Sequence, residues 1–139
     1  TDKMAKDLLD FIVAHRSENR ATLVGFSGVL GSGKTTFSQV IARELGVVDQ
    51  VTSPTFVIEK KYQILNPKFS THYSQLIHID AYRLEGGAEL SKLGFADILA
   101  DLKNLIILEW PEKVADILPK DMIEVKFEWL DDQIRAITF

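Results

Sequence analysis

The chain of 139 residues carries a formal net charge of −4, and 46% of its residues are hydrophobic against 26% charged. This balance is typical of a globular protein and predicts one domain over residues 1–139, while the acidic excess argues against a free-standing nucleic-acid binder. The lack of cysteine excludes disulfides, thiolate metal sites and cysteine nucleophiles, and without a secretory signal pattern or an apolar run near ~18 residues we expect a cytoplasmic protein.

The first third of the chain is predicted to alternate helix, strand and helix. Residues 21–28, ATLVGFSG, are typical of a buried strand that ends in glycine. Residues 35–45 are predicted to form a helix that Gly46 closes. Before them, five apolar side chains recur at helical spacing and predict an amphipathic helix over residues 2–15: Met4, Leu8, Leu9, Ile12 and Val13.

The middle of the chain is predicted to hold a pair of strands. Residues 56–65 and residues 72–80 are two runs rich in β-forming side chains. Residues 66–71, NPKFST, are predicted to be a loop between them, so the two runs suit an antiparallel hairpin.

The last third is predicted to add a helix, a buried strand, a short helix and a terminal hairpin. Residues 88–102 have helical spacing, and residues 104–110, NLIILEW, form the continuous apolar run of a buried parallel strand. Pro111 is predicted to open a short helix over residues 111–118. Residues 122–139 alternate in the manner of a β-hairpin.

The most informative motif is FSGVLGSGKTTF, in which Gly28, Gly33, Lys34 and Thr35 have the spacing of a phosphate-binding loop (P-loop). It stands between a predicted strand and a predicted helix, the context that this loop requires. Its glycines let backbone N–H groups surround phosphates, Lys34 is expected to reach the outer phosphates, and Thr35 is expected to place its hydroxyl on magnesium. The fold class predicted is therefore α/β: a single-domain P-loop NTPase with a mainly parallel central sheet flanked by helices, plus antiparallel strand pairs.

Magnesium needs a second protein anchor, which is usually a carboxylate at the end of a neighbouring buried strand. Two apolar runs end in an acid, QLIHID at Asp80 and LIILE at Glu109. Glu109 follows the more continuous apolar run, so we assign it to magnesium and assign Asp80 to the attacking water or the terminal phosphate. The reverse assignment stays open.

Four further features are ambiguous from local chemistry alone. The segment VTSPTF, residues 51–56, is either a switch segment or a plain turn stiffened by Pro54. Trp110 either covers the site or packs in the core, and Arg83 either contacts phosphate or a partner or is merely exposed. His78, inside a predicted strand, is expected to be structural.

The motifs GKTTF, SPTF, HIDAYRL and ILEWPE follow one another in this order, and with them the chain resembles the TsaE family over residues 21–139. That resemblance implies magnesium held by Thr35 and Glu109, an essential aspartate at Asp80, and a switch segment at Ser53-Pro54-Thr55. It also implies the ATP or ADP contacts, which are Gly28, Val29, Leu30, Gly31, Ser32, Gly33, Lys34, Thr35, Thr36, Trp110 and, near the adenine, Arg135.

The resemblance further implies an ATPase that is weak alone and acts with the TsaD–TsaB pair. That pair transfers a threonylcarbamoyl group to an adenosine beside the tRNA anticodon, so tRNA is expected to be met only through partners. Neither a membrane nor DNA is expected as a partner. One departure is that the family loop commonly reads GDLGAGKT, whereas this chain has Val29 and Ser32 in place of the aspartate and the alanine. Nucleotide binding is expected to survive both changes, and the loss of an acid at Val29 is expected to affect partner contact or hydrolysis.

Two other functions remain open from the residues. A small-molecule kinase normally adds an arginine-rich lid, but residues 86–108 contain only Lys92 and Lys103 as basic side chains. A nucleotide-dependent interaction module without useful turnover would share the same loop. A GTPase is disfavoured because the chain lacks an Asn-Lys-x-Asp base-reading motif.

Overall fold

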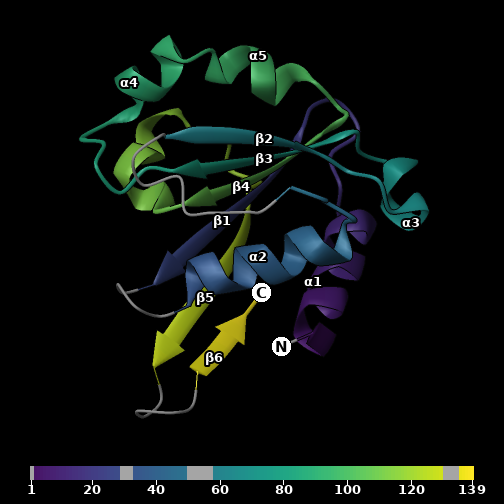
Figure 1. Ribbon diagram of the computed structural model, residues 1–139. Coiled ribbons are helices and arrows are strands. Elements are labelled where there is room, and N and C mark those ends of the chain that lie inside the picture. Colours follow the sequence, from purple (N-terminus) through teal and green to yellow (C-terminus); the bar gives the residue numbers. More distant parts are fainter. Residues whose placement is uncertain (1, 29–32, 50–57, 130–134) are drawn as a thin grey trace.

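The computed structural model describes residues 2–28, 33–49, 58–129 and 135–139 and arranges them as one sheet between two helical layers (Figure 1). Six strands form the sheet in the order β2-β3-β4-β1-β5-β6. Helices α1 and α2 cover one face, and α4, α5 and the 3-10 helix η1 cover the other. The element bounds are α1 Asp2–Ala14, β1 Thr22–Gly28, α2 Lys34–Glu44, β2 Glu59–Gln63, α3 Pro67–Ser70, β3 Gln75–Asp80, α4 Gly87–Lys92, α5 Phe95–Ala100, β4 Asn104–Glu109, η1 Pro111–Ile117, β5 Ile123–Trp129 and β6 Arg135–Thr138.

The centre of the sheet is parallel and its two edges are antiparallel. Strand β4 pairs in parallel with β1 and β3, and β5 pairs in parallel with β1. The edge strands β2 and β6 run antiparallel to β3 and β5, so both predicted hairpins are confirmed, as is the predicted fold class. In the register of these pairs, Glu109 is the partner of both Phe26 and Asp80, so the ends of β1, β3 and β4 meet at one edge of the sheet.

The two faces of the sheet pack against separate hydrophobic cores. Along β4, Leu105 and Ile107 join the core under α1 and α2, whereas Ile106 and Leu108 join the core under α4, α5 and η1. A strand buried on both faces needs a continuous apolar run, which is why NLIILEW was recognisable from sequence. Burial on both sides holds β4 rigidly, and its last residue, Glu109, with it.

Two predicted elements differ in the structure. Residues 66–71 were expected to be a loop, but Pro67–Ser70 form the short helix α3, which Asn66 caps by accepting a hydrogen bond from the Lys68 amide (3.0 Å). The single helix expected over residues 88–102 is two helices, because Gly94 lies between them with a φ of 83°. That left-handed conformation suits glycine and interrupts a helix.

The short helix after Pro111 is confirmed, but it is a 3-10 helix with a non-helical residue, Val114 (φ −131°). Both Val114 and Ile117, three residues further along η1, pack into the core that α4 covers. The tight contact between η1 and α4 is visible at Gly87, where an added Cβ would lie 2.4 Å from Ile117.

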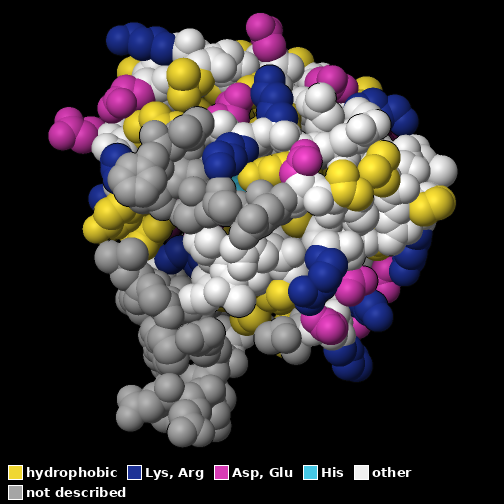
Figure 2. All heavy atoms as spheres, in the orientation of Figure 1, with side chains coloured by type: hydrophobic (Ala, Val, Ile, Leu, Met, Phe, Trp, Pro, Cys, Tyr) yellow, Lys and Arg dark blue, Asp and Glu magenta, His cyan; other side chains and the backbone are white. Residues whose placement is uncertain are grey.

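One face of the described molecule carries mixed charges. Figure 2 shows Lys and Arg side chains interspersed with Asp and Glu side chains over the described part of one face. Among the described helices, none is both long and apolar enough to cross a bilayer.

The edge strand β2 contains a carboxylate whose burial predicts a pH-dependent stability. The Glu59 side chain is 16% exposed, its Oε1 lacks a hydrogen-bond partner among the described residues, and Lys61 Nζ lies 4.0 Å from its Oε2. Burial raises the pKa of Glu59 above its ordinary 4.5, against the opposing effect of Lys61. The folded chain therefore keeps this proton to a higher pH than the unfolded chain, so stability is lost as pH rises through the folded-state pKa.

Glu59→Gln is accordingly expected to raise the melting temperature at pH 7 and to have a smaller effect near pH 4, where the native carboxyl is protonated. Thermal unfolding across this pH range measures the difference. Glu128→Gln, an exposed carboxylate on β5, is the matched control and should leave the melting temperature unchanged at both pH values. A Glu59→Gln variant that is less stable at pH 7 would contradict the assignment of a destabilising buried charge.

Candidate functional site

The site forms where β1 ends and α2 begins. Strand β1 ends at Gly28 (φ 147°), and α2 starts at Lys34 immediately after Gly33, which has a left-handed φ of 94°. Both positive φ values favour glycine, which explains why the P-loop pattern demands glycine at these two positions. The N-terminus of a helix carries a partial positive charge and directs backbone N–H groups outward, and both features suit an anion.

Lys34 extends back across this junction. Its Nζ donates to the Gly28 carbonyl (2.5 Å) and lies 3.9 Å from the centre of the Trp110 ring. The residue is only 6% exposed, and burial lowers the pKa of Lys34 from its ordinary value of 10.5. Three carboxylates oppose that effect and favour the charged amine: Glu109, Glu112 and Asp80. Lys34 thus has a buried amine that lies between the end of β1, the Trp110 ring and three acids.

Thr35 and Glu109 are brought together across 74 positions of sequence. The Thr35 hydroxyl donates to Glu109 Oε1 (3.3 Å), and Glu109 is only 2% exposed at the end of β4. The predicted pair of magnesium ligands therefore lies at hydrogen-bond distance. A hydroxyl and a carboxylate oxygen are hard donors of the type that Mg²⁺ prefers, usually with few protein ligands. The described residues contain no cluster of three or more acidic or histidine side chains that could hold a metal.

Asp80 lies beside Glu109 at the end of the neighbouring strand. The two residues are register partners, and Asp80 is 9% exposed. Its Oδ1 accepts a hydrogen bond from the Tyr82 amide (2.9 Å), which closes a tight turn directly after β3. The structure thus places both candidate carboxylates at one edge of the sheet, with Glu109 the one in contact with Thr35.

Trp110 lies between the core and the Lys34 side chain. It packs against the core under η1, and its ring also lies over the Lys34 amine and 5.0 Å from the Tyr82 ring. Within the described ranges it is the only non-glycine residue with a positive φ (62°). Its amide donates to the Phe26 carbonyl (3.1 Å), which ties the strained turn to β1.

His78 contacts Glu109, a neighbour that the sequence did not indicate. Its Nε2 lies 2.5 Å from Glu109 Oε2, and both side chains are almost fully buried, which agrees with the structural role expected for a histidine inside a strand. The available signal was the alternation of β3, which places His78 and Asp80 on the same face of the strand. The link to Glu109 depends on the pairing of β3 with β4, which the sequence alone did not supply.

Several predicted contacts lie outside the described residues. These are Val29, Leu30, Gly31 and Ser32 of the loop, the Ser53-Pro54-Thr55 segment, and the side chain of Arg135. Of the remaining candidates, Thr36 and Arg83 are exposed.

Two cavities lie away from this constellation. One cavity, of about 450 Å³, opens where β1 and β5 begin, at the other end of these strands from the candidate site. Its lining includes Arg16, Arg20 and Thr22. The other, about 390 Å³, lies under η1 and includes Ser27 and Glu112.

Comparisons with known proteins agree on one family. The family model described as "Threonylcarbamoyl adenosine biosynthesis protein TsaE" matches residues 1–137. A relative named tRNA threonylcarbamoyladenosine biosynthesis protein TsaE from Borreliella burgdorferi is 40% identical over 97 residues, which are 70% of this chain and 65% of the relative. A relative of the same name from Streptomyces coelicolor is 36% identical over 121 residues, 84% of this chain and 77% of the relative.

This chain spans only part of the length of these relatives, and the match covers 65% of the Borreliella protein. Among solved structures, the crystal structure of Bacillus subtilis YdiB superposes with a TM-score of 0.66 at 22% identity. That superposition covers 99% of this chain and 78% of the other, and it supports the fold.

Proposed function

The chain belongs to the TsaE family, and from that premise we propose that it binds and hydrolyses ATP as an accessory protein in threonylcarbamoyl-adenosine modification of tRNA. The observation that carries the proposal is the convergence of Lys34, Thr35, Glu109 and Asp80 at the start of α2. Phosphoryl transfer with magnesium requires such a set of groups: a buried cation, a hydroxyl and two carboxylates at the ends of strands.

In this proposal the P-loop holds the phosphates, and Lys34 moves its amine from the Gly28 carbonyl onto their outer oxygens. Thr35 and Glu109 would hold Mg²⁺, which would supply positive charge to neutralise the phosphates of ATP. The short distance between the Thr35 hydroxyl and Glu109 Oε1 (3.3 Å) supports their sharing one cation.

Asp80 is proposed to orient the attacking water. The water oxygen forms the new bond to the γ-phosphorus as the bond to the bridging oxygen of ADP breaks, and Asp80 accepts the proton that the water loses. The Asp80 carboxylate is fixed by the Tyr82 amide and stands beside Glu109, which supports this position. Lys34 stabilises the charge that develops on the terminal phosphate.

We propose that the TsaD–TsaB pair completes the machinery and stimulates turnover. Asp80 is the only catalytic base that the motifs offer. A partner that adds catalytic groups to the site, or orders those already there, would explain why ATP hydrolysis by this chain alone is expected to be weak. The net charge of −4 and the mixed described surface support tRNA contact through partners rather than through this chain.

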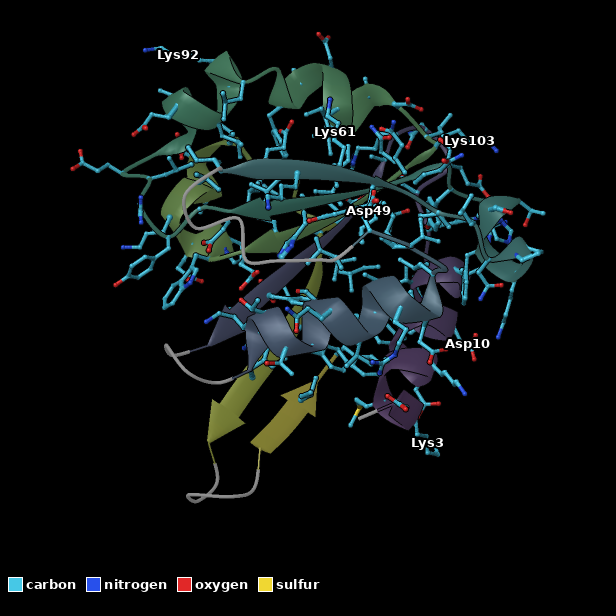
Figure 3. The ribbon with its side chains drawn as sticks, viewed as in Figure 1. Lys3, Asp10, Asp49, Lys61, Lys92 and Lys103 are labelled. Atoms are coloured by element: carbon cyan, nitrogen blue, oxygen red, sulfur yellow. The ribbon has the colours of Figure 1, made fainter. Side chains whose placement is uncertain are left out.

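A kinase function has no comparable support. A kinase lid would need basic side chains, and the candidates for it are Lys92 and Lys103. Figure 3 shows these two lysines at opposite ends of the α4–α5 side of the molecule. Lys103 also donates to the Thr71 carbonyl (3.3 Å). A chromatographic assay of the reaction products should find free phosphate and ADP, whereas a phosphorylated small molecule would favour the kinase.

Glu109→Gln is expected to weaken the magnesium dependence of ATP binding. The amide keeps the shape but loses the negative charge that attracts the cation, so the gain in ATP affinity on adding magnesium should fall at least about tenfold, about 1.4 kcal/mol. Titration of a fluorescent ATP analogue with and without magnesium measures this gain. Binding in the absence of the metal should change far less.

Glu112→Gln is the matched control, because Glu112 also acts on the charge of Lys34 but is exposed. Its magnesium dependence should match that of the wild type. If Glu109→Gln also matches the wild type while Asp80→Asn loses the metal effect, the two carboxylates have the reverse roles.

A further inference from the structure

A buried histidine stands behind the candidate metal ligand. The side chains of His78 and Glu109 are 1% and 3% exposed, and His78 Nε2 lies 2.5 Å from Glu109 Oε2. On either side of His78 along β3, Ile77 and Ile79 are fully buried. Among the described residues, the imidazole is the hydrogen-bond partner of this carboxylate oxygen.

The two oxygens of the Glu109 carboxylate have different neighbours. Oε2 accepts from His78, while Oε1 accepts from the Thr35 hydroxyl at 3.3 Å. The last torsion of a glutamate side chain is soft and broadly distributed, so an unsupported carboxylate could rotate and exchange its oxygens. A hydrogen bond to one oxygen fixes the plane of the group and thereby the direction of the other.

The other nitrogen of the His78 imidazole, Nδ1, is buried and makes no hydrogen bond to the described residues. A buried polar atom left unsatisfied costs about 1–3 kcal/mol, so a residue that served packing alone would be replaced by an apolar one at no loss. Donation from Nε2 to Glu109 is the contact that distinguishes histidine from leucine at this position.

We propose that His78 is a positioning residue that holds Glu109 with Oε1 toward Thr35 and the magnesium ion of bound ATP. This inference rests on the proposed function, since it assigns His78 a purpose only if Glu109 binds the cation. His78 acts through Glu109 and touches neither nucleotide nor metal. Groups that hydrogen-bond a metal ligand from behind typically change metal affinity about 10–100-fold when they are removed.

The test is the magnesium affinity of the complete chain with a fluorescent ATP analogue bound, measured by titrating MgCl₂. His78→Leu keeps the bulk but removes the donor, and His78→Gln places an amide N–H near the position of Nε2. His78→Asn places its amide near Nδ1, too short to reach Glu109. Tyr73→Phe is the matched control, because it removes a buried hydrogen bond to Thr22 (2.7 Å) in the same core, at the other end of β1.

We expect His78→Leu and His78→Asn to bind magnesium about 10–100-fold more weakly, and His78→Gln to return to within about threefold of the wild type. Tyr73→Phe should lose thermal stability but keep its magnesium affinity. Metal-free binding of the analogue should stay within about threefold in every variant. If the role of His78 were purely structural, its variants would have lower melting temperatures, but His78→Gln and His78→Asn would not differ in magnesium affinity.

The outcomes separate the two proposals. If magnesium leaves the analogue's affinity for the wild type unchanged, the proposed function fails, and the role of His78 with it. If the wild type responds to magnesium and His78→Leu and His78→Asn respond equally well, the role of His78 alone is overturned. Should His78→Leu fail to fold, equal magnesium affinities in the glutamine and asparagine variants would overturn it.

Discussion

Replacing Lys34 by alanine is expected to weaken ATP binding at least about 100-fold, or about 2.7 kcal/mol, measured by titration of a fluorescent ATP analogue. Two effects add. The variant loses the charged donor that the proposal places on the outer phosphates, where hydrogen bonds to charged groups contribute about 1.5–3 kcal/mol each. It also leaves the acids around that amine uncompensated, so they repel the anionic nucleotide: Glu109, Glu112 and Asp80.

The same variant should stay folded. Burial lowers the pKa of Lys34, which means that the charged amine is desolvated in the folded chain and stabilises it little. Lys113→Ala is the matched control: Lys113 is an exposed lysine near the Tyr82 ring (5.8 Å) at the same edge of the site. Lys113→Ala should bind ATP as the wild type does. Unchanged ATP affinity in folded Lys34→Ala would refute the P-loop assignment.

Asp80→Asn is expected to bind ATP within about threefold of the wild type but to lower hydrolysis in the partner complex by about 10²–10⁴-fold, the usual contribution of a positioned acid–base group. Asparagine is preferred to alanine because its Oδ1 can still accept from the Tyr82 amide, so the turn after β3 keeps its hydrogen bond. The loss then reports the negative charge rather than the local structure. Phosphate release under single-turnover conditions is the measurement.

Asp116→Asn is the control for this substitution. Asp116 also accepts a hydrogen bond from a backbone amide, that of Gly87 (3.0 Å), but it lies on η1 against α4 rather than at the strand ends. Turnover should be unchanged in this control. Normal turnover in Asp80→Asn would reject a catalytic role for Asp80.

The parts of the site that are local in sequence were predictable. Gly28, Gly33, Lys34 and Thr35 lie within one strand-turn-helix unit, so their spacing alone located the junction that the structure shows. Glu109 was recognisable because it ends an apolar run, and a strand buried on both faces needs such a run. Its contact with Thr35 followed from the general geometry of P-loop proteins rather than from local chemistry.

The parts that depend on tertiary context were not predictable. His78 meets Glu109 because β3 and β4 are parallel neighbours in one register, and residues 31 positions apart carry no local signal of that contact. The positive φ of Trp110 opposes the ordinary preference of a bulky residue, and its amide is hydrogen-bonded to the Phe26 carbonyl in this conformation. The helical spacing of residues 88–102 does not show that the left-handed φ of Gly94 divides this segment into α4 and α5.

The central claim, an ATPase that depends on partners, is tested most directly by phosphate release from ATP with and without purified TsaD–TsaB. We predict slow release by the chain alone and an increase of at least about tenfold with the pair, about 1.4 kcal/mol of activation free energy. The increase should be absent in Asp80→Asn. Equal rates with and without TsaD–TsaB would contradict the account.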